Sequence, residues 1–129
     1  NVIQHPLPTA LRCWKLGQAI RKAVASYPKD TKVVILGTGG MSHQLNGARF
    51  GFLNTDFDND FLDNIEADPM KLTELTHQQI MEDAGAEAVE LIMWLTMRGA
   101  LDGPVRRVHR NYYAPMTTGM GLITLEEAS

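Results

Sequence analysis

Apolar side chains recur at helical spacing over two long parts of the chain. After the cap residue Thr9, apolar positions within residues 11–24 alternate with basic ones, which predicts a helix with one wet face. The longest helical pattern covers residues 84–101 and is apolar on nearly every side of its centre, so this helix should lie buried between layers. It contains Glu87 and Glu90, one turn apart, and a carboxylate in such surroundings needs a cation, a metal or hydrogen-bond donors.

Shorter helices are expected between these two. One is capped by Thr55 or Asp56 and runs to about Ala67, a second starts near Met70, and a third is capped by Thr76. Three aspartates at positions 56, 58 and 60 suggest a calcium loop. Because the loop lacks the glycine and the final glutamate of an EF-hand, an acidic cluster at a helix start is the better interpretation.

Strand-like patterns occur in the first third of the chain and near its end. The β-branched run Val33–Leu36 has no polar face, which predicts a buried strand. Together with an apolar opening before Pro6 and the first helix, it predicts a βαβ unit, and hence an α/β fold with a layered αβα arrangement and a mixed or parallel sheet. Residues 105–113 alternate with a basic face, and residues 121–125 predict the last strand.

Length and charge narrow the class of protein. The 129 residues suffice for one domain, expected over 1–129, and the net charge of −3 gives no reason to expect nucleic acid or an anionic membrane. No apolar run reaches the roughly 20 residues of a membrane span, and no signal peptide is apparent. The single Cys13 fits a reducing, cytoplasmic compartment and is expected to be buried and inert. The start without methionine suggests a processed or truncated chain.

One histidine stands out chemically. Three glycines, Gly37, Gly39 and Gly40, follow the predicted strand and allow a sharp turn, which offers His43 at the carboxyl end of a strand. A histidine there can serve as an acid/base near neutral pH or be a satisfied structural histidine. Glu90 can be a metal ligand, as in two-histidine, one-carboxylate iron sites, or half of a buried ion pair.

Three stretches carry a family resemblance: Gly37–Leu45, Gly47–Phe52 and Ala84–Leu95. Together they strongly resemble the catalytic subunits of LigB-like type II extradiol ring-cleaving dioxygenases, the family that includes protocatechuate 4,5-dioxygenases and gallate dioxygenases. The resemblance runs along essentially the whole chain but covers only the C-terminal half of the family's catalytic subunit.

The resemblance implies an Fe(II) enzyme that opens a carboxylated catechol with O2, protocatechuate first and gallate as the alternative. His43 resembles the family's acid/base and Glu90 its carboxylate iron ligand, with Glu87 in its vicinity or near substrate. Thr117 and Thr118 fall where the family places small polar residues that contact the ring substituent.

The family's two histidine ligands belong to its N-terminal half, so this chain alone is expected to be inactive. His5 and His109 lie outside the ligand motifs: we interpret His5 as a histidine at a strand end near a proline and His109 as exposed on a basic edge. His77 is interpreted as a surface residue. The resemblance also leaves open a small helical alpha subunit and a homo-oligomer. The competing interpretations are an inert fragment or interaction subunit, whose exposed core face would be sticky, and a zinc or metal-independent member of the same superfold.

Overall fold

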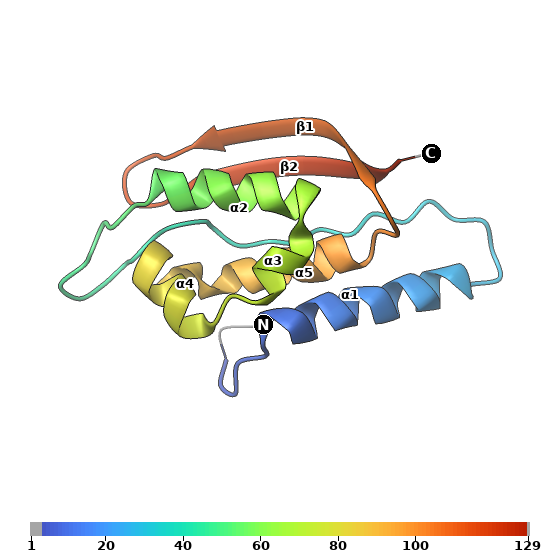
Figure 1. Cartoon of the computed structure of the whole chain (residues 1–129), viewed down its shortest axis with the longest axis horizontal. Coiled ribbons are helices and arrows are strands. Elements are labelled where there is room, and N and C mark those ends of the chain that lie inside the picture. Colours follow the sequence, from blue (N-terminus) through green and yellow to red (C-terminus); the bar gives the residue numbers. More distant parts are fainter. Residues whose placement is uncertain (1–3, 129) are drawn as a thin grey trace.

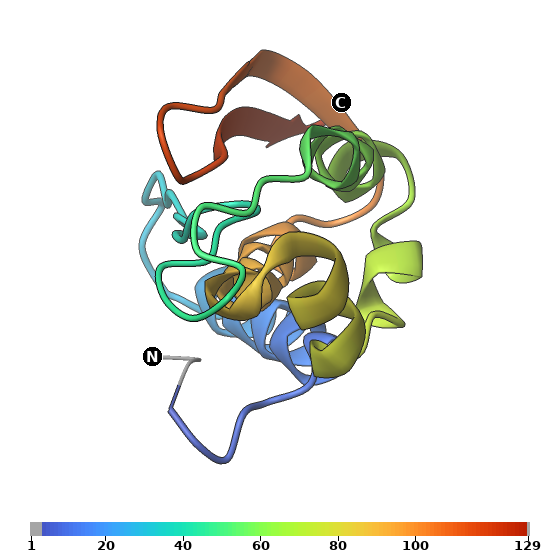
Figure 2. The ribbon, with the colours of Figure 1, turned by 90° about the vertical axis from the view of Figure 1, so that its left-hand side faces the viewer.

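Residues 4–128, the part of the chain that this computed structural model describes, contain two antiparallel strands and six helical segments (Figure 1). In chain order these elements are α1 (Ala10–Ala25), α2 (Thr55–Ala67), α3 (Pro69–Thr73), α4 (His77–Ala84), the 3-10 helix η1 (Ala86–Leu91), α5 (Ile92–Gly99), β1 (Val105–Tyr113) and β2 (Met120–Glu127). The hairpin lies on one side of the molecule and α1 with α5 on the opposite side (Figure 2). Helix α2 flanks the space between them.

The predicted helices are confirmed, with small shifts of their ends. Thr9 caps α1 through a hydrogen bond from the backbone N–H of Arg12, and Thr76 caps α4 as expected. Helix α2 is capped by Asn54 and not by the predicted Thr55 or Asp56. The 84–101 pattern is the exception, because it forms the 3-10 helix η1 followed by α5 and not one continuous α-helix.

The core lies where α5, η1 and α2 meet. The apolar face of α2 packs on α5, and the Phe61 ring meets the edge of Trp94 at a centroid distance of 6.0 Å. Helix α1 crosses α5 closely, and its Cys13 is buried, as expected, with a pKa that burial raises. The described chain therefore has a continuous apolar core between its helices.

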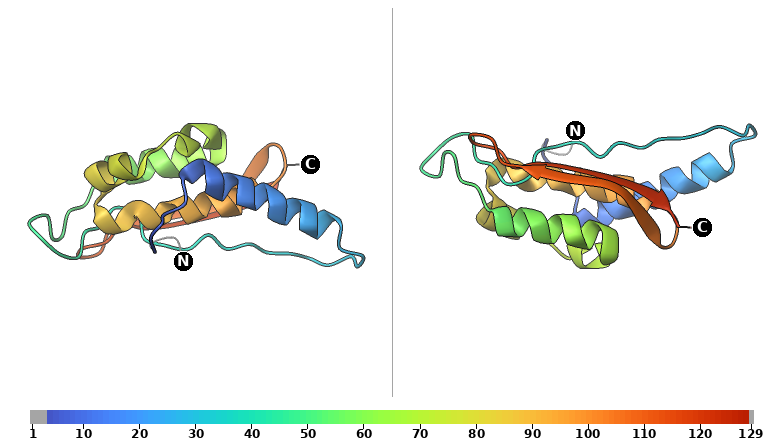
Figure 3. Two further views of the ribbon diagram at one scale, coloured as in Figure 1. Left: turned by 90° about the horizontal axis from the view of Figure 1, so that it is seen from below. Right: turned by 90° about the horizontal axis from the view of Figure 1, so that it is seen from above.

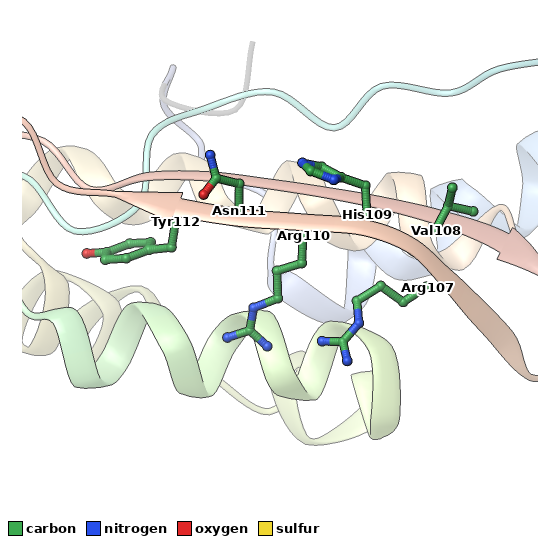
Figure 4. A pocket seen from close by; sticks show the side chains of 6 residues that line it. All are labelled: Arg107, Val108, His109, Arg110, Asn111 and Tyr112. Carbon is green, nitrogen blue, oxygen red and sulfur yellow. The ribbon is translucent and has the colours of Figure 1, made fainter.

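The hairpin confirms the two strands predicted near the end of the chain. Strand β1 pairs antiparallel with β2, and the register shifts between Arg107 and His109. This irregularity lets both Arg107 and Arg110 point to α2 (Figure 4). Arg107 pairs with Glu66, and Arg110 pairs with Asp63, so two ion pairs tie β1 to α2. The shallow depression along β1 is therefore lined by arginines that already have acidic partners.

The predicted strand Val33–Leu36 is wrong for this structure. These residues form part of an extended segment that runs back from the end of α1 along the length of the molecule (Figures 1 and 3). No described residue pairs with this run in a sheet, and Val34 and Leu36 are 72% and 81% exposed. A run without a polar face becomes a buried strand only where neighbouring strands pair with it and helices cover both of its faces, and no strand of residues 4–128 pairs with this run.

The fold is thus an α/β mixture, but the layered arrangement on a parallel sheet is not seen. The one sheet in the described residues is the antiparallel hairpin. The opening strand was expected at the start of the chain, where residues 1–3 lie outside the described part. Within the described part, no helix has both the length and the apolar character that crossing a bilayer requires.

Candidate functional site

His43 sits where the extended segment, the end of α4 and the hairpin meet. Its backbone N–H donates to the Ala84 carbonyl at 2.8 Å, and its backbone forms an isolated antiparallel bridge with Thr118. The residue is buried, with 6% of its surface exposed. Its position is therefore set by backbone contacts to two elements distant in sequence, and not by the local loop alone.

The imidazole ring has a defined orientation. Nδ1 lies 2.6 Å from the Met41 carbonyl oxygen. Because a carbonyl can only accept a hydrogen bond, Nδ1 carries a proton, and Nε2 is the ring atom that can take or release one. Nε2 faces Glu90 at 3.5 Å from Oε1. The two residues singled out by the sequence therefore lie side by side, with the proton-accepting nitrogen toward the carboxylate.

Glu90 is held by the glycine loop. Oε1 accepts the backbone N–H of Gly40 at 2.7 Å, and Gly39 adopts a positive φ of 124° against the Glu90 side chain. A Cβ at Gly39 would lie 2.8 Å from Cγ of Glu90, so a side chain there would displace the carboxylate. Within residues 4–128, Oε2 makes no hydrogen bond to protein, and the side chain is 29% exposed. Glu90 thus has one oxygen fixed and one available.

Glu87 binds the part of the same loop that follows His43. Its carboxylate accepts the Leu45 backbone N–H at 3.2 Å and the Asn46 amide at 3.4 Å. Side chains at i and i+3 eclipse in a 3-10 helix, so η1 aligns Glu87 with Glu90 on one face. The two carboxylates bind the loop before and after His43. Glu87 therefore has a loop-holding position in this structure.

The C-terminus of α4 anchors the loop that follows His43. The last four carbonyls of a helix lack partners within the helix. Here Arg49 donates to the carbonyls of residues 81 and 82 at 3.1 and 2.8 Å, and the Asn54 side chain donates to residue 83 at 2.8 Å. The backbone N–H of His43 donates to the fourth carbonyl, that of residue 84. Arg49 also covers the Phe52 ring at 4.0 Å from its centroid. Sequence inspection gave Arg49 no role.

Thr117 and Thr118 lie in the turn that joins the two strands. The Thr118 methyl is the nearest neighbour of Gly40, where a Cβ would meet it at 2.9 Å. Thr117 is half-buried beside Gly51. Thr118 is therefore brought to the His43 and Gly40 loop, while Thr117 lies at the margin of the same group. Gly37 lies farther back, against the α5 backbone at Trp94.

Asp58 is a residue of the site region whose burial the sequence analysis did not anticipate. It was assigned to an acidic helix start, yet it is fully buried in α2. Its carboxylate accepts the Ser42 backbone N–H at 2.7 Å, the Ser42 hydroxyl at 2.6 Å and the Tyr112 hydroxyl at 2.7 Å. Burial and the hydrogen bond to Asp58 raise the pKa of Tyr112 to about 12. The available signal was spacing, because residue 58 lies on the apolar stripe of Phe61, Leu62 and Ile65.

The described residues do not form a complete metal site. No group of three or more His, Cys, Asp or Glu side chains converges within residues 4–128. His109 is exposed, as expected, and His5, expected at the end of a strand, is exposed in a bend. His77, predicted at the surface, is half-buried, with Nε2 2.7 Å from the Pro8 carbonyl. Glu90, whose Oε1 lies beside His43 and whose Oε2 makes no hydrogen bond within residues 4–128, is therefore the candidate for one metal ligand.

Comparison with known proteins agrees with the resemblance seen in the sequence. A family model described as the catalytic LigB subunit of aromatic ring-opening dioxygenase matches residues 1–123. The chain is also 50% identical over 126 residues to a protein of Pseudomonas putida named gallate dioxygenase. That match covers 98% of this chain and 37% of the relative, so the chain spans little more than a third of the relative's length. Since the family model matches nearly all of it, the chain belongs to the family of catalytic LigB subunits of aromatic ring-opening dioxygenases.

Proposed function

We propose that this chain supplies the acid/base and the carboxylate ligand of an Fe(II)-dependent extradiol dioxygenase that opens a carboxylated aromatic diol with O2. The observation that supports this most is the paired geometry of His43 and Glu90. Nδ1 is committed to a carbonyl, Nε2 is available for proton transfer, and the carboxylate lies 3.5 Å away. Opening of a diol ring involves removal of a hydroxyl proton, and a positioned histidine is the side chain that most often performs such a transfer.

The donor set fits a share of an iron site. Glu90 offers one carboxylate oxygen, and two-histidine, one-carboxylate sites for iron(II) need one such ligand. The two histidines would come from parts of the protein outside these 129 residues. When bound, iron(II) would act as a Lewis acid for the diol and pass electrons from the ring to dioxygen. The chain alone is then expected to be inactive.

The chain's own residues define the remaining steps. Nε2 of His43 accepts a proton from a diol hydroxyl, while the Nδ1–H bond to Met41 keeps the ring in one orientation. Gly40 N–H holds Glu90 in place during this transfer. To Thr118, which lies beside Gly40, and to Thr117 in the same turn we assign the contact with the carboxylate of the ring. Glu87 keeps the loop closed on its far side.

The name of the relative bears on the substrate. The sequence resemblance put protocatechuate first, but the curated relative at 50% identity is a gallate dioxygenase. We therefore place gallate ahead of protocatechuate. Both carry a ring carboxylate and differ by one hydroxyl, so the ratio of kcat/KM values for the two substrates decides between them.

The test uses the full-length protein, loaded with iron(II) without oxygen and then offered gallate or protocatechuate separately. We expect oxygen uptake with a ring-fission absorbance. His43→Ala should keep iron and lower turnover by roughly 10²–10⁴-fold. Glu90→Gln should lose iron. Glu87→Gln is the matched control for iron content and should retain it, since Glu87 binds the Leu45 N–H. Unchanged iron in Glu90→Gln would contradict the ligand assignment.

The metal itself needs a separate arm of the experiment. Reconstitution with zinc in place of iron distinguishes the redox reaction from the hydrolytic or metal-independent chemistry that the same fold could host. Oxygen uptake with iron and none with zinc is the expected result. Equal turnover with both metals would exclude the dioxygenase mechanism.

A further inference from the structure

Asp58 is a fully buried carboxylate that the proposed reaction does not use. Its three donors are the backbone N–H and hydroxyl of Ser42 and the hydroxyl of Tyr112. Among the ion pairs of residues 4–128, none involves Asp58. A carboxylate without a cation is costly to bury unless donors replace its water, and here all three donors come from parts of the chain that surround the site.

The carboxylate and the imidazole of His43 bind the same peptide group. Asp58 Oδ1 accepts the N–H of Ser42 at 2.7 Å, and the His43 Nδ1 proton goes to the carbonyl of Met41 at 2.6 Å. Met41 C=O and Ser42 N–H belong to one planar peptide, in which they point in opposite directions. The order in space is therefore carboxylate, peptide N–H, peptide C=O and imidazole N–H.

The peptide between the two side chains is shielded from water and held on both sides. Met41 and Ser42 are fully buried. The Met41 N–H donates to the Gly119 carbonyl, and the Gly119 N–H donates to the Ser42 carbonyl, each at 2.8 Å. The Ser42 hydroxyl also accepts the Asn54 N–H at 2.9 Å. In such a low-dielectric setting, hydrogen bonds in a chain strengthen one another.

We propose that Asp58 is a positioning residue for His43 and acts through the Met41–Ser42 peptide group. The carboxylate fixes the plane of this peptide and polarises it, so that the Met41 carbonyl becomes a stronger acceptor for Nδ1–H. This keeps the ring turned with Nε2 toward Glu90. The arrangement does for His43 what a carboxylate bonded directly to Nδ1 does in a catalytic triad, with a peptide inserted between them. We call the hydrogen-bonded series from the Asp58 carboxylate through the Met41–Ser42 peptide to the His43 ring the relay. Its effect on the reaction rate rests on the proposed function, whereas the relay itself does not.

The first test is independent of catalysis and uses the metal-free, full-length protein. The Nδ1–H proton of His43 is measured by NMR and assigned by its loss in His43→Gln. In the wild type we expect a downfield, slowly exchanging resonance. Asp58→Asn keeps the shape of the side chain but removes its charge, so the Met41 carbonyl becomes a weaker acceptor. The Nδ1–H resonance should then move upfield, and this proton should exchange with water about tenfold faster or more. Asp56→Asn, an exposed aspartate two residues earlier on α2, is the matched control and should change neither.

Tyr112→Phe separates the relay from general support of the fold. It removes a donor from Oδ2 and leaves Oδ1 with the Ser42 N–H intact. We expect it to keep the Nδ1–H resonance. An effect of Tyr112→Phe as large as that of Asp58→Asn would overturn the proposal, because the network would then act by holding β1. Should Asp58→Asn not fold, Ser42→Ala must keep the resonance, since it retains the backbone N–H, and its loss would overturn the relay.

Kinetics provides the second test. Asp58→Asn should lower kcat by about 10- to 100-fold, with iron content unchanged and KM little affected, since misorientation of a catalytic group acts on the reaction step. Wild-type kcat together with a wild-type Nδ1–H resonance in Asp58→Asn would refute the role of Asp58. Absence of ring opening in the wild type with every diol would instead refute the proposed function, and the NMR result would still decide the relay.

Discussion

Replacing Gly85 by alanine should displace His43 without touching either side chain of the proposed site. Gly85 has φ 102° and ψ 159°, a backbone conformation that is essentially confined to glycine. A Cβ there would overlap the His43 carbonyl oxygen and lie 2.7 Å from its carbon, where ordinary contacts begin at 3.4 Å. Relief of this overlap moves the two backbones apart by about 1 Å, a displacement that costs about 10²-fold in rate at a catalytic group.

The same change should lower stability by an amount that can be estimated. Backbone strain contributes about 1–3 kcal/mol and overpacking about 1–3 kcal/mol. Their sum of about 2–6 kcal/mol is a large part of a typical folding free energy of about 5–15 kcal/mol. The backbone hydrogen bond from His43 N–H to Ala84 lies next to the overlap and should weaken with it.

Gly103→Ala is the matched control for Gly85→Ala. Gly103 also has a positive φ, 61°, but a Cβ there meets nothing within 4 Å among the described residues 4–128. It should therefore show only the backbone penalty of about 1–2 kcal/mol and leave kcat unchanged. Denaturant unfolding and steady-state kinetics of the full-length variants measure both quantities. Equal stability of the two variants, together with wild-type kcat in Gly85→Ala, would refute the reasoning.

Three further predictions concern stability. Gly17→Ala should destabilise by about 1–3 kcal/mol because its Cβ would overlap the Thr96 carbonyl and force α1 from α5; a gain in thermal stability, as helix propensity alone predicts, would contradict this. The raised pKa of Tyr112, about 12 against 10.0 when unfolded, favours the unfolded state as pH rises from 10 to 12, so stability measured against pH should fall less steeply in Tyr112→Phe. Arg49→Ala should lower the free energy of unfolding, measured by chemical denaturation, by about 1–2 kcal/mol and increase amide exchange in the last turn of α4. Its control is Lys71→Ala, which removes an exposed ion pair and should change the free energy of unfolding by less than about 1 kcal/mol.

The helices and the hairpin could be predicted because their signals are local. Thr9 and Thr76 cap helices through their own side chains. The strands predicted over residues 105–113 and 121–125 pair across the short turn that joins them. The run Val33–Leu36 could not be placed in the same way. Its apolar character indicates that it favours burial. A strand also needs a neighbouring strand to pair with, and this pairing depends on the surrounding fold.

The candidate residues His43 and Glu90 could be found from sequence, whereas what holds them could not. The glycines and the histidine form a compact motif, and Glu90 stands out as an acid in an apolar helix. Asp58 was overlooked because a neighbouring pair of aspartates made it look like part of a helix start. Its burial follows from its place on the apolar stripe of α2, and its partners Ser42 and Tyr112 lie 16 and 54 residues away.

The 3-10 geometry of η1 aligns Glu87 and Glu90, which the helical pattern already places on one face, more closely than an α-helix would. In a continuous α-helix, side chains three residues apart are neighbours on one face but are offset by about 60° around the axis. In a 3-10 helix they eclipse, and both reach the loop that carries His43. Such a helix has poorer backbone hydrogen bonds and is uncommon over six residues, so it persists where contacts outside it compensate. The compensating contacts are the Gly40 and Leu45 N–H groups, which means that the site stabilises the very helix that forms it.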